Sequence, residues 1–312
     1  MKINFLYCFD KNFNHQALTS INSLLNKVSK KVDLHIIHDD LSSLESLKYK
    51  ILDHKNIRNL NLYKFSTSSL KLPKAITHVT EATFYRLFIS DYLSKEIKNL
   101  VYLDADIICN LDPISSLEES FNKMEVENKT LSAYVESTRE RKPDYFKRLN
   151  LKNNNKLNAG VLLINYRKWV SENTSSKLKE ILEEKSTELF DYDQEILNLY
   201  FDDNFTKIEK KLNYQVTNNR SISYLQKVKK EAIFVHYLGK DKPWDFFRIL
   251  IPTSMIYQNE YKKLNEGKLH LTFTKNKRNF FRLLKIIFTL SFLNFEHPAL
   301  YLKHSFISVF KK

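Results

Sequence analysis

Residues 100–106 read Leu-Val-Tyr-Leu-Asp-Ala-Asp, an apolar run that ends in two carboxylates one residue apart. The apolar character of Leu100–Leu103 predicts a buried strand, because a short apolar run bounded by turn residues is typical of a strand with both faces covered. Asp104 and Asp106 follow this strand. Beyond its end, side chains no longer have to alternate between the two faces of the sheet, so both carboxylates can turn toward one divalent cation. The alternative is a turn in which the Asp side chains hydrogen-bond their own backbone.

Strands and helices alternate on both sides of this stretch. The apolar periodicity predicts strands at 2–7, 32–38, 61–65, 131–135, 161–164 and 232–236. It predicts helices at 15–30, 44–52, 80–93, 175–184 and 194–200. The alternation indicates an α/β fold with a parallel or mixed sheet and helices on its faces. In such sheets ligands bind beyond the carboxyl ends of the strands.

The composition of the 312-residue chain excludes several classes of protein. Its 43% hydrophobic content is typical of a folded globular protein. Its three glycines, Gly160, Gly239 and Gly267, are too few for a P-loop or a GxGxxG fingerprint. Its two cysteines, Cys8 and Cys109, exclude a disulfide framework, and we expect buried free thiols. The N-terminus lacks the pattern of a signal peptide, so we expect a cytoplasmic protein.

Much of the net charge of +14 lies at the C-terminus. Residues 275–312 contain eight Lys and Arg residues and one acid, Glu296, so they carry half of the net positive charge of the chain. Aromatic and aliphatic residues recur between these charges at helical spacing. We predict two helices, 277–293 and 297–310, that lie on an anionic membrane surface. The alternative is that they pack on the preceding domain. We expect one domain over residues 1–250 and a basic amphipathic region over 251–312.

So basic a protein could also bind nucleic acid through its positive surface. The Lys and Arg residues of this chain do not fall into a recognisable nucleic-acid-binding module such as a helix-turn-helix. We therefore expect no nucleic-acid partner.

Four further polar clusters lie at the ends of predicted elements. They are Asp10–Asn12, Asn158–Gly160, Asp191–Glu195, and His236 with Gly239 and Lys242. Taken singly, each has an ordinary structural explanation. The first two suit turns, the third a helix N-cap, and the last a structural histidine. Taken together, they suit a site for a nucleotide sugar.

Six motifs, in this order, resemble the retaining glycosyltransferases of family 8. They are CFDKNF (8–13), FYRLFISDYL (84–93), LVYLDADI (100–107), NAGVLLINYRKW (158–169), DYDQEILN (191–198) and HYLGKDKPW (236–244). The resemblance covers about residues 1–245 and implies a GT-A fold, which is a Rossmann-like α/β domain with a mixed central sheet. It implies a catalytic domain that transfers glucose or galactose, with retention, from UDP-glucose or UDP-galactose to a surface glycan such as a lipopolysaccharide core. A membrane-bound tail would then hold the enzyme on the inner face of the cytoplasmic membrane.

The resemblance also implies roles for individual residues. Asp104, Asp106 and His236 match the ligands of a Mn²⁺ or Mg²⁺ ion, and carboxylate with imidazole favours a first-row transition metal. Gln194, Asp193 and Glu195 match catalytic positions around the donor sugar. The residues implied to contact the nucleotide or the donor are Asp10, Asn12, Arg86, Asp104, Ala105, Asp106, Asn158, Gly239 and Lys242.

Two positions depart from the family's pattern, since Lys11 replaces an acid and Glu195 replaces an aspartate. How the enzyme retains configuration stays open. Glu195 is the better candidate nucleophile for a double displacement. We favour front-side attack, with Gln194 stabilising an oxocarbenium-like state. We expect acceptor residues in loops around His78–Thr83 and Glu136–Tyr145. An inactive sugar-binding relative of the same fold is the remaining alternative, and the intact metal-ligand set argues against it.

Overall fold

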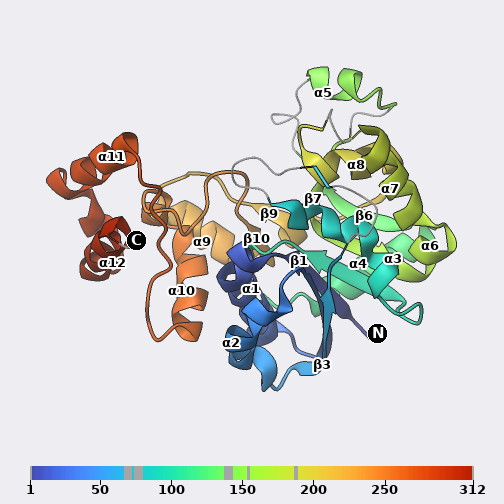
Figure 1. Ribbon diagram of the computed structural model, residues 1–312, viewed down its shortest axis with the longest axis horizontal. Helices are drawn as coiled ribbons and strands as arrows, with labels where there is room; N and C mark the ends of the chain where they lie inside the picture. The colour runs from blue at the N-terminus through green and yellow to red at the C-terminus, as the bar shows by residue number, and fades with distance from the viewer. Residues whose placement is uncertain are drawn as a thin grey trace.

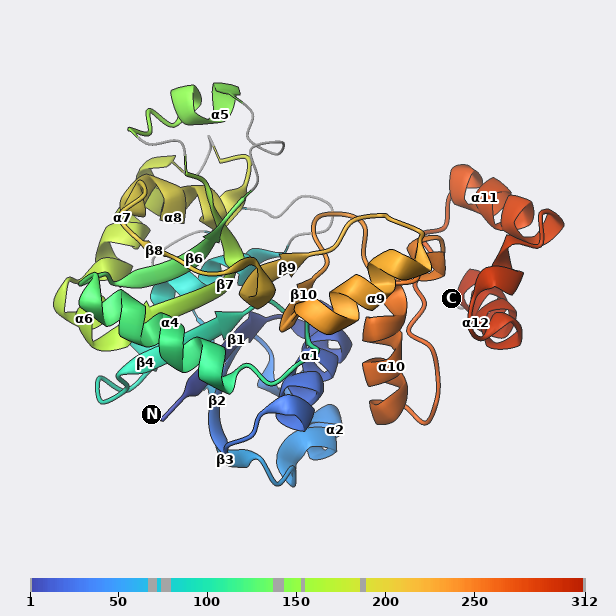
Figure 2. The ribbon, with the colours of Figure 1, turned by 180° about the vertical axis from the view of Figure 1, so that it is seen from behind.

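The central feature of the protein is a seven-stranded sheet with the strand order β3-β2-β1-β4-β7-β6-β8 (Figures 1 and 2). The structure is a computed structural model that describes residues 2–66, 72–73, 80–136, 143–152, 155–185 and 189–310. The strands of this sheet are β1 Asn4–Phe9, β2 Val32–His38, β3 Ile57–Lys64, β4 Asn99–Leu103, β6 Leu131–Val135, β7 Leu157–Asn165 and β8 Thr206–Lys207.

The sheet is mixed, as the sequence predicts. β1 pairs in parallel with both β2 and β4, and β2 pairs in parallel with β3. β7 runs antiparallel to β4 on one side and to β6 on the other. The carboxyl ends of β1 and β4 therefore meet at one edge of the sheet, which is where Asp10 and Asp104 follow them.

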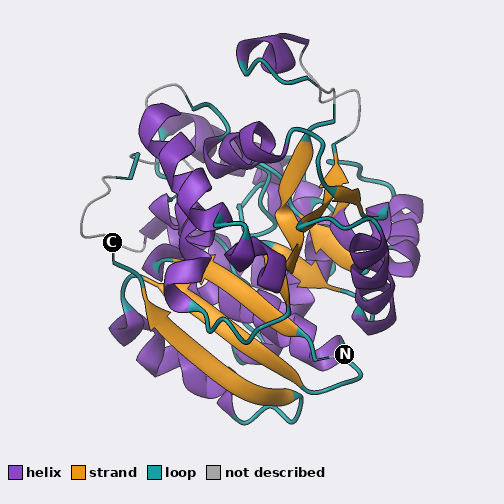
Figure 3. Ribbon diagram, turned by 90° about the vertical axis from the view of Figure 1, so that its right-hand side faces the viewer, coloured by secondary structure: helices purple, strands orange, loops and turns teal. Residues whose placement is uncertain are grey.

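Both faces of the sheet are covered by helices (Figure 3), which explains the continuous apolar run in β4. Val101 and Leu103 belong to one buried core, whereas Leu100 and Tyr102 belong to the other. The first core is closed by α1 Asn14–Lys27, α2 Leu41–Leu52 and α4 Ile114–Val126. The second is closed by the 3₁₀ helix η2 Glu81–Phe88, α3 Ile89–Tyr92, α6 Tyr166–Ser171, α7 Thr174–Lys185 and α8 Tyr192–Phe201.

A second, three-stranded sheet lies beside the first and has the order β5-β10-β9. Its strands are β5 Ile107–Cys109, β9 Tyr214–Gln215 and β10 Phe234–His236. The remaining elements of this part of the molecule are three 3₁₀ helices and two α-helices. They are η1 Lys11–Phe13, η3 Lys210–Asn213, η4 Arg248–Leu250, α9 Ile222–Glu231 and α10 Ser254–Leu264. Because β5 begins three residues after Asp104, this small sheet is tied directly to the predicted metal site.

The structure differs from the sequence-based prediction in several elements. Residues 80–93 form mainly a 3₁₀ helix, η2, and only its last turn, α3, is α-helical. Sequence analysis does not predict α4 or α9, although buried Ile114, Leu117, Phe121 and Met124 give α4 a regular apolar face. The two cysteines are free and buried, as expected.

The C-terminal residues form α11 Lys277–Phe288, the 3₁₀ helix η5 Ser291–Asn294 and α12 Pro298–Phe310, at one end of the molecule (Figures 1 and 2). The two predicted helices are therefore present, the first of them shorter than expected. Their inner side belongs to a buried cluster that includes Phe246, Ile249 and Met255, so it packs on the preceding segment. The hydroxyl of Tyr301 donates to the carbonyl of Phe246 at 3.0 Å. None of the helices in the described part of the chain has the length and apolar character to cross a bilayer.

The predicted boundary at residues 250 and 251 falls between η4 and α10. α10 contacts α1, and its Tyr257 is fully buried against Trp244. These contacts tie the start of the 251–312 region to the sheet domain, whereas α11 and α12 lie farther out.

Candidate active site

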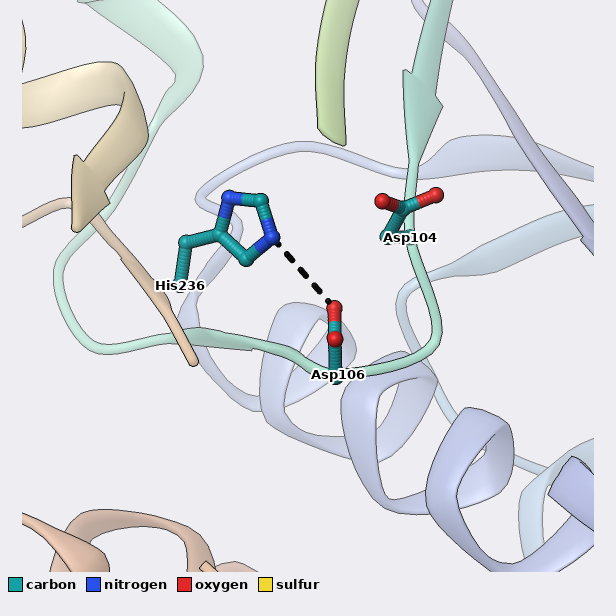
Figure 4. Close-up of side chains that lie close together, drawn as sticks. All are labelled: Asp104, Asp106 and His236. Carbon is teal, nitrogen blue, oxygen red and sulfur yellow. Dashed lines mark ion pairs between the residues drawn. The ribbon is translucent and has the colours of Figure 1, made fainter. Parts of the chain in front are cut away.

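Three side chains that the sequence assigns to a metal converge at the carboxyl end of β4. Asp104, Asp106 and His236 each offer a ligand atom, and these atoms lie within 4.8 Å of one another. Figure 4 shows the carboxylates on one side and the imidazole on the other, with the Nε2 atom of His236 3.6 Å from the Oδ1 atom of Asp106. The structure thus brings together two residues of one turn and a third from far along the chain.

Strand pairing explains this convergence. The N–H of Asp104 donates to the carbonyl of Gly160 at 2.9 Å, and the N–H of Ile107 donates to the carbonyl of Asp104 at 3.2 Å, which closes a tight turn. β5 follows this turn and pairs with β10 in antiparallel register, so that His236 lies opposite Ile107. His236 is therefore held next to Asp106 by backbone pairing.

Gly160 has a specific steric role at this point. A Cβ atom added there would lie 2.2 Å from the Cε1 atom of His236 and 2.8 Å from its Nδ1 atom. Real Cβ atoms do not approach ring atoms so closely, so any larger residue would displace the imidazole. The sequence places Gly160 in a predicted turn, and the structure shows that the absence of a side chain there makes room for His236, the predicted metal ligand.

The electrostatics of the cluster favour a charged carboxylate on Asp106 and a neutral imidazole on His236. Burial opposes ionisation of Asp106, but Lys242 and His236 outweigh it and hold the pKa of Asp106 below its usual value. Lys242 donates to the Oδ2 atom of Asp106 and also to the carbonyl of Tyr237 at 2.7 Å. Burial lowers the pKa of His236, which keeps its ring neutral at physiological pH.

Arg86 connects Asp104 to the donor-side residues. Its guanidinium lies 2.8 Å from the Oδ1 atom of Asp104 and 3.0 Å from the Oδ2 atom of Asp193. Burial opposes the charge of Arg86, but the carboxylates of Asp104 and Asp193 outweigh it and raise its pKa. Burial raises the pKa of Asp193 to about 6, partly offset by Arg86 and Thr83. The hydroxyl of Tyr102 donates to Asp104 at 2.6 Å, which further fixes this carboxylate.

A chain of amide side chains runs from the metal cluster to Gln194. The Oε1 atom of Gln194 accepts from the N–H of Ala159 at 3.0 Å and from Asn158 at 3.3 Å. The Nε2 atom of Gln194 donates to Glu136 at 3.3 Å. The Oδ1 atom of Asn158 accepts from Asn213 at 2.8 Å, and the Oδ1 atom of Asn213 lies 2.9 Å from the Nδ1 atom of His236.

Most of these residues line a cavity of about 830 Å³. The volume is within the range of pockets that enclose small organic ligands. Of the residues that the sequence assigns to the site, the cavity is lined by Arg86, Asp104, Ala105, Asp106, Asn158, Asp193, Gln194, Glu195, His236, Gly239 and Lys242. These predicted positions thus surround one space, although they come from five separate motifs.

Asp10 and Asn12 lie beside this cavity and are not among its lining residues. Asp10 caps η1 by accepting from the backbone N–H of Asn12 at 2.9 Å. The neighbouring Cys8, Phe9 and Phe13 line the cavity instead. The predicted contacts of Asp10 and Asn12 with a nucleotide stay a prediction.

The predicted acceptor loops are described only in part, because residues 74–79 and 137–142 lie outside the described chain. Within the described residues, Thr83 from the first loop and Glu136 and Tyr145 from the second line the cavity. Glu195 is fully buried and accepts from Arg148 and from the N–H of Phe190.

Sequence analysis misses several residues of the site. Lys156 lies between the carboxylates of Glu136 and Asp191, at 3.2 and 2.6 Å. No pattern in the sequence points to Asn213. It comes near the site only because η3 leads into β9 of the three-stranded sheet. Tyr102 could be found from the sequence, because it precedes Asp104 by two residues and shares its face of the strand.

The chain is similar in sequence to known proteins. The family model of Glycosyl transferase family 8 matches residues 4–247. The chain is 30% identical over 250 residues to a lipopolysaccharide 1,3-galactosyltransferase of Salmonella typhimurium, covering 78% of this chain and 73% of that protein. It is 28% identical over 286 residues to a lipopolysaccharide 1,2-glucosyltransferase of Escherichia coli, covering 83% and 81%.

The fold has solved counterparts. The structure superposes on that of the galactosyltransferase LgtC in complex with donor and acceptor sugar analogues, with a TM-score of 0.69 at 19% identity. The match covers 89% of this chain and 98% of LgtC. The mixed sheet and its helices thus form a GT-A fold, and the chain belongs to glycosyl transferase family 8.

Proposed function

We propose that this protein is a metal-dependent, retaining hexosyltransferase that moves glucose or galactose from a UDP-sugar to a surface-glycan acceptor such as a lipopolysaccharide core. The observation that carries the proposal is the cluster of Asp104, Asp106 and His236, which lines one cavity together with residues of the other motifs. The choice of hexose and acceptor is supported by the activities of the two lipopolysaccharide transferases described above.

The ligand atoms of Asp104, Asp106 and His236 suit a divalent cation. The Oδ1 atom of Asp106 is buried and has no hydrogen-bond partner among the described residues, although it faces the imidazole of His236. Buried carboxylate oxygens are normally satisfied, so one left without a donor beside two further ligands suits a metal ion. When bound, Mn²⁺ or Mg²⁺ would neutralise charge that develops on the departing diphosphate.

The residues of this chain are arranged to hold the rest of a nucleotide sugar. Lys242 is within reach of Asp106 and can pass from that carboxylate to a phosphate oxygen once the carboxylate binds a metal. Arg86 and Asp193 form a buried, charged wall on the donor side. Gln194 is fixed by Ala159 and Glu136, so its amide keeps one orientation toward the donor sugar.

Incubation with UDP-sugars tests the proposed function directly. Purified protein with Mn²⁺ should release UDP slowly from UDP-glucose or UDP-galactose by hydrolysis, and release should stop with EDTA. A panel of other UDP-sugars serves as the comparison. If no donor in the panel yields UDP in the presence of either Mn²⁺ or Mg²⁺, the proposal is wrong.

The contacts of Gln194 and Glu195 support front-side attack. Glu195 is fully buried, and its two carboxylate oxygens accept from Arg148 and Phe190. The carbonyl oxygen of Gln194 accepts two hydrogen bonds, which lowers its already weak nucleophilicity. Neither side chain is thus well placed to attack the sugar as a nucleophile. In front-side attack, the leaving phosphate then takes the proton of the acceptor hydroxyl.

Replacing Gln194 with alanine should lower kcat but leave measurable turnover. The amide supports the transition state in a front-side reaction without forming a bond, and a single polar group of this kind contributes about 10²–10³-fold. Steady-state UDP release with Mn²⁺ measures the effect. A glycosyl adduct trapped on Glu195 in the wild-type enzyme would instead establish double displacement.

We also propose that α11 and α12 bind an anionic membrane and so place the enzyme beside a lipid-linked acceptor on the inner face of the cytoplasmic membrane. Seven exposed large apolar residues lie in this region: Phe280, Phe281, Phe288, Leu290, Leu293, Phe306 and Ile307. Lys277, Arg278, Arg282 and Lys285 lie on or beside α11. Each basic residue near an anionic surface contributes about 1 kcal/mol. Apolar insertion and charge therefore act together.

The double substitution of Phe281 and Phe288 by serine should release the full-length protein from vesicles that contain anionic lipid. These rings are 66% and 82% exposed, so their removal leaves the packed inner side intact. Burial of one Phe contributes about 1.5–3 kcal/mol, so partitioning should fall more than tenfold in vesicle sedimentation. Val126 and Ile222 are also exposed apolar residues, and their substitution by serine is the matched control. Equal sedimentation of both double variants would contradict membrane binding by the helices.

A further inference from the structure

Asn213 is a buried residue at the end of η3 that no sequence motif contains. Its side chain lies between the predicted metal ligand His236 and the donor-side Asn158, at 2.9 and 2.8 Å. It is fully buried, so water cannot replace either contact. The inference rests on the proposed metal site and concerns which residues prepare it.

The direction of each hydrogen bond in this chain follows from one backbone group. The N–H of Gly160 can only donate, and it donates to the Oδ1 atom of Asn158 at 3.1 Å. That oxygen therefore also accepts from the amide nitrogen of Asn213. The amide of Asn213 is planar, so its carbonyl oxygen must face the Nδ1 atom of His236.

This orientation fixes the tautomer of His236. A carbonyl oxygen only accepts, so the Nδ1 atom carries the proton of the neutral ring. The Nε2 atom then keeps its lone pair, and it is the atom that faces Asp106 at 3.6 Å. Metal-ligating histidines commonly donate their second ring N–H to such a partner, which fixes the ring and its tautomer.

We propose that Asn213 is a positioning residue that couples the two halves of the site: it holds His236 in the metal-ready tautomer and, through the same amide, holds Asn158. Asn158 in turn donates to Gln194 and Glu136. Loss of Asn213 should thus affect metal binding and donor-side catalysis by separate hydrogen bonds.

Two substitutions separate these hydrogen bonds. Asn213→Leu removes both, and the affinity for Mn²⁺, measured by calorimetry in the presence of UDP, should fall about 10–100-fold. Asn213→Asp keeps an acceptor for His236 but loses the donor to Asn158. It should therefore retain most of the Mn²⁺ affinity while its kcat for UDP-sugar hydrolysis falls.

A matched control exists at the opposite end of the sheet. Asn4 is also a buried asparagine that contacts a buried histidine, His35, at 3.3 Å, and donates to the carbonyl of Asn99. Asn4→Leu should lower the melting temperature as a buried change does, while Mn²⁺ affinity and kcat stay at wild-type values. A purely structural role for Asn213 predicts that Asn213→Leu behaves like Asn4→Leu.

The tautomer can be read without metal, by ¹⁵N NMR of histidine-labelled protein. Wild type and Asn213→Asp should show His236 protonated at Nδ1, whereas Asn213→Leu should show a shift toward Nε2 protonation. A wild-type ring protonated at Nε2, or unchanged Mn²⁺ affinity in Asn213→Leu, would overturn the inference. Failure of wild type to bind Mn²⁺ at all would instead refute the proposed function, so the two failures are distinguishable.

Discussion

Gly160→Ala is expected to abolish most metal-dependent activity although it adds a single methyl group. The new Cβ atom would lie 2.2 Å from the Cε1 atom of His236, and the backbone at Gly160 cannot retreat because its carbonyl accepts from Asp104 in the sheet. The imidazole must therefore move. We expect Mn²⁺ affinity to fall about tenfold or more and the free energy of unfolding to fall by about 1–3 kcal/mol.

A double-mutant cycle identifies the cause. In a His236→Ala background the steric conflict is gone, so Gly160→Ala should cost little stability. Gly267→Ala is the control for a glycine substitution far from the site. The φ of +75° at Gly267 makes alanine strained, yet the added Cβ would lie more than 4 Å from every described residue other than its chain neighbours. It should lower the melting temperature without changing Mn²⁺ affinity. Additive losses in the cycle would contradict the steric explanation.

Asp106→Asn should eliminate measurable UDP-sugar hydrolysis while the fold is kept. Changes to residues that only support a metal ligand cost about 10–100-fold, so the neutralisation of a ligand itself is expected to cost a hundredfold or more in Mn²⁺ affinity. The substitution also removes the partner of Lys242, which then lacks its counter-ion next to the site. Calorimetric titration of Mn²⁺ and UDP-release kinetics measure both effects.

Asp33→Asn provides the matched control for this change. Asp33 is a buried aspartate with a cationic partner, Lys2, at 2.8 Å, and it lies on β2 away from the cavity. Its substitution should reduce stability but leave Mn²⁺ affinity and turnover near wild type. If Asp106→Asn hydrolyses UDP-sugars as fast as Asp33→Asn does, Asp106 is not a ligand.

The parts of the fold that the sequence predicts are those with local periodicity. β1, β2 and β4 are apolar runs with clear ends, and the six motifs are each contiguous. The mixed sheet and most of the cavity lining follow from them. Of the small sheet, β10 lies within the strand predicted at 232–236, whereas β5 and β9 have only three and two residues, which is too short for a periodic signal. The small sheet that carries His236 to Asp106 therefore appears only in three dimensions.

The supporting residues of the site could not be predicted for the same reason. Asn213 and Lys156 act through partners that are distant in sequence, so their roles depend on tertiary packing. Gly160 shows the intermediate case: its residue type indicates a close approach, but only the structure identifies His236 as the neighbour. The C-terminal helices are a third case. They carry apolar residues both on the side that packs on the protein and on the exposed side, so the sequence pattern alone does not distinguish the two sides.

Calorimetric titration of UDP into the wild-type protein, with Mn²⁺ and then with EDTA, tests most directly whether the Asp104, Asp106 and His236 cluster holds a nucleotide sugar through a metal. We expect that UDP binds with Mn²⁺ and that its affinity falls at least about tenfold when the metal is removed, because two carboxylates then face the diphosphate without a cation between them. Equal binding of UDP with EDTA, or Mn²⁺ binding that survives Asp104→Asn and Asp106→Asn together, would contradict it.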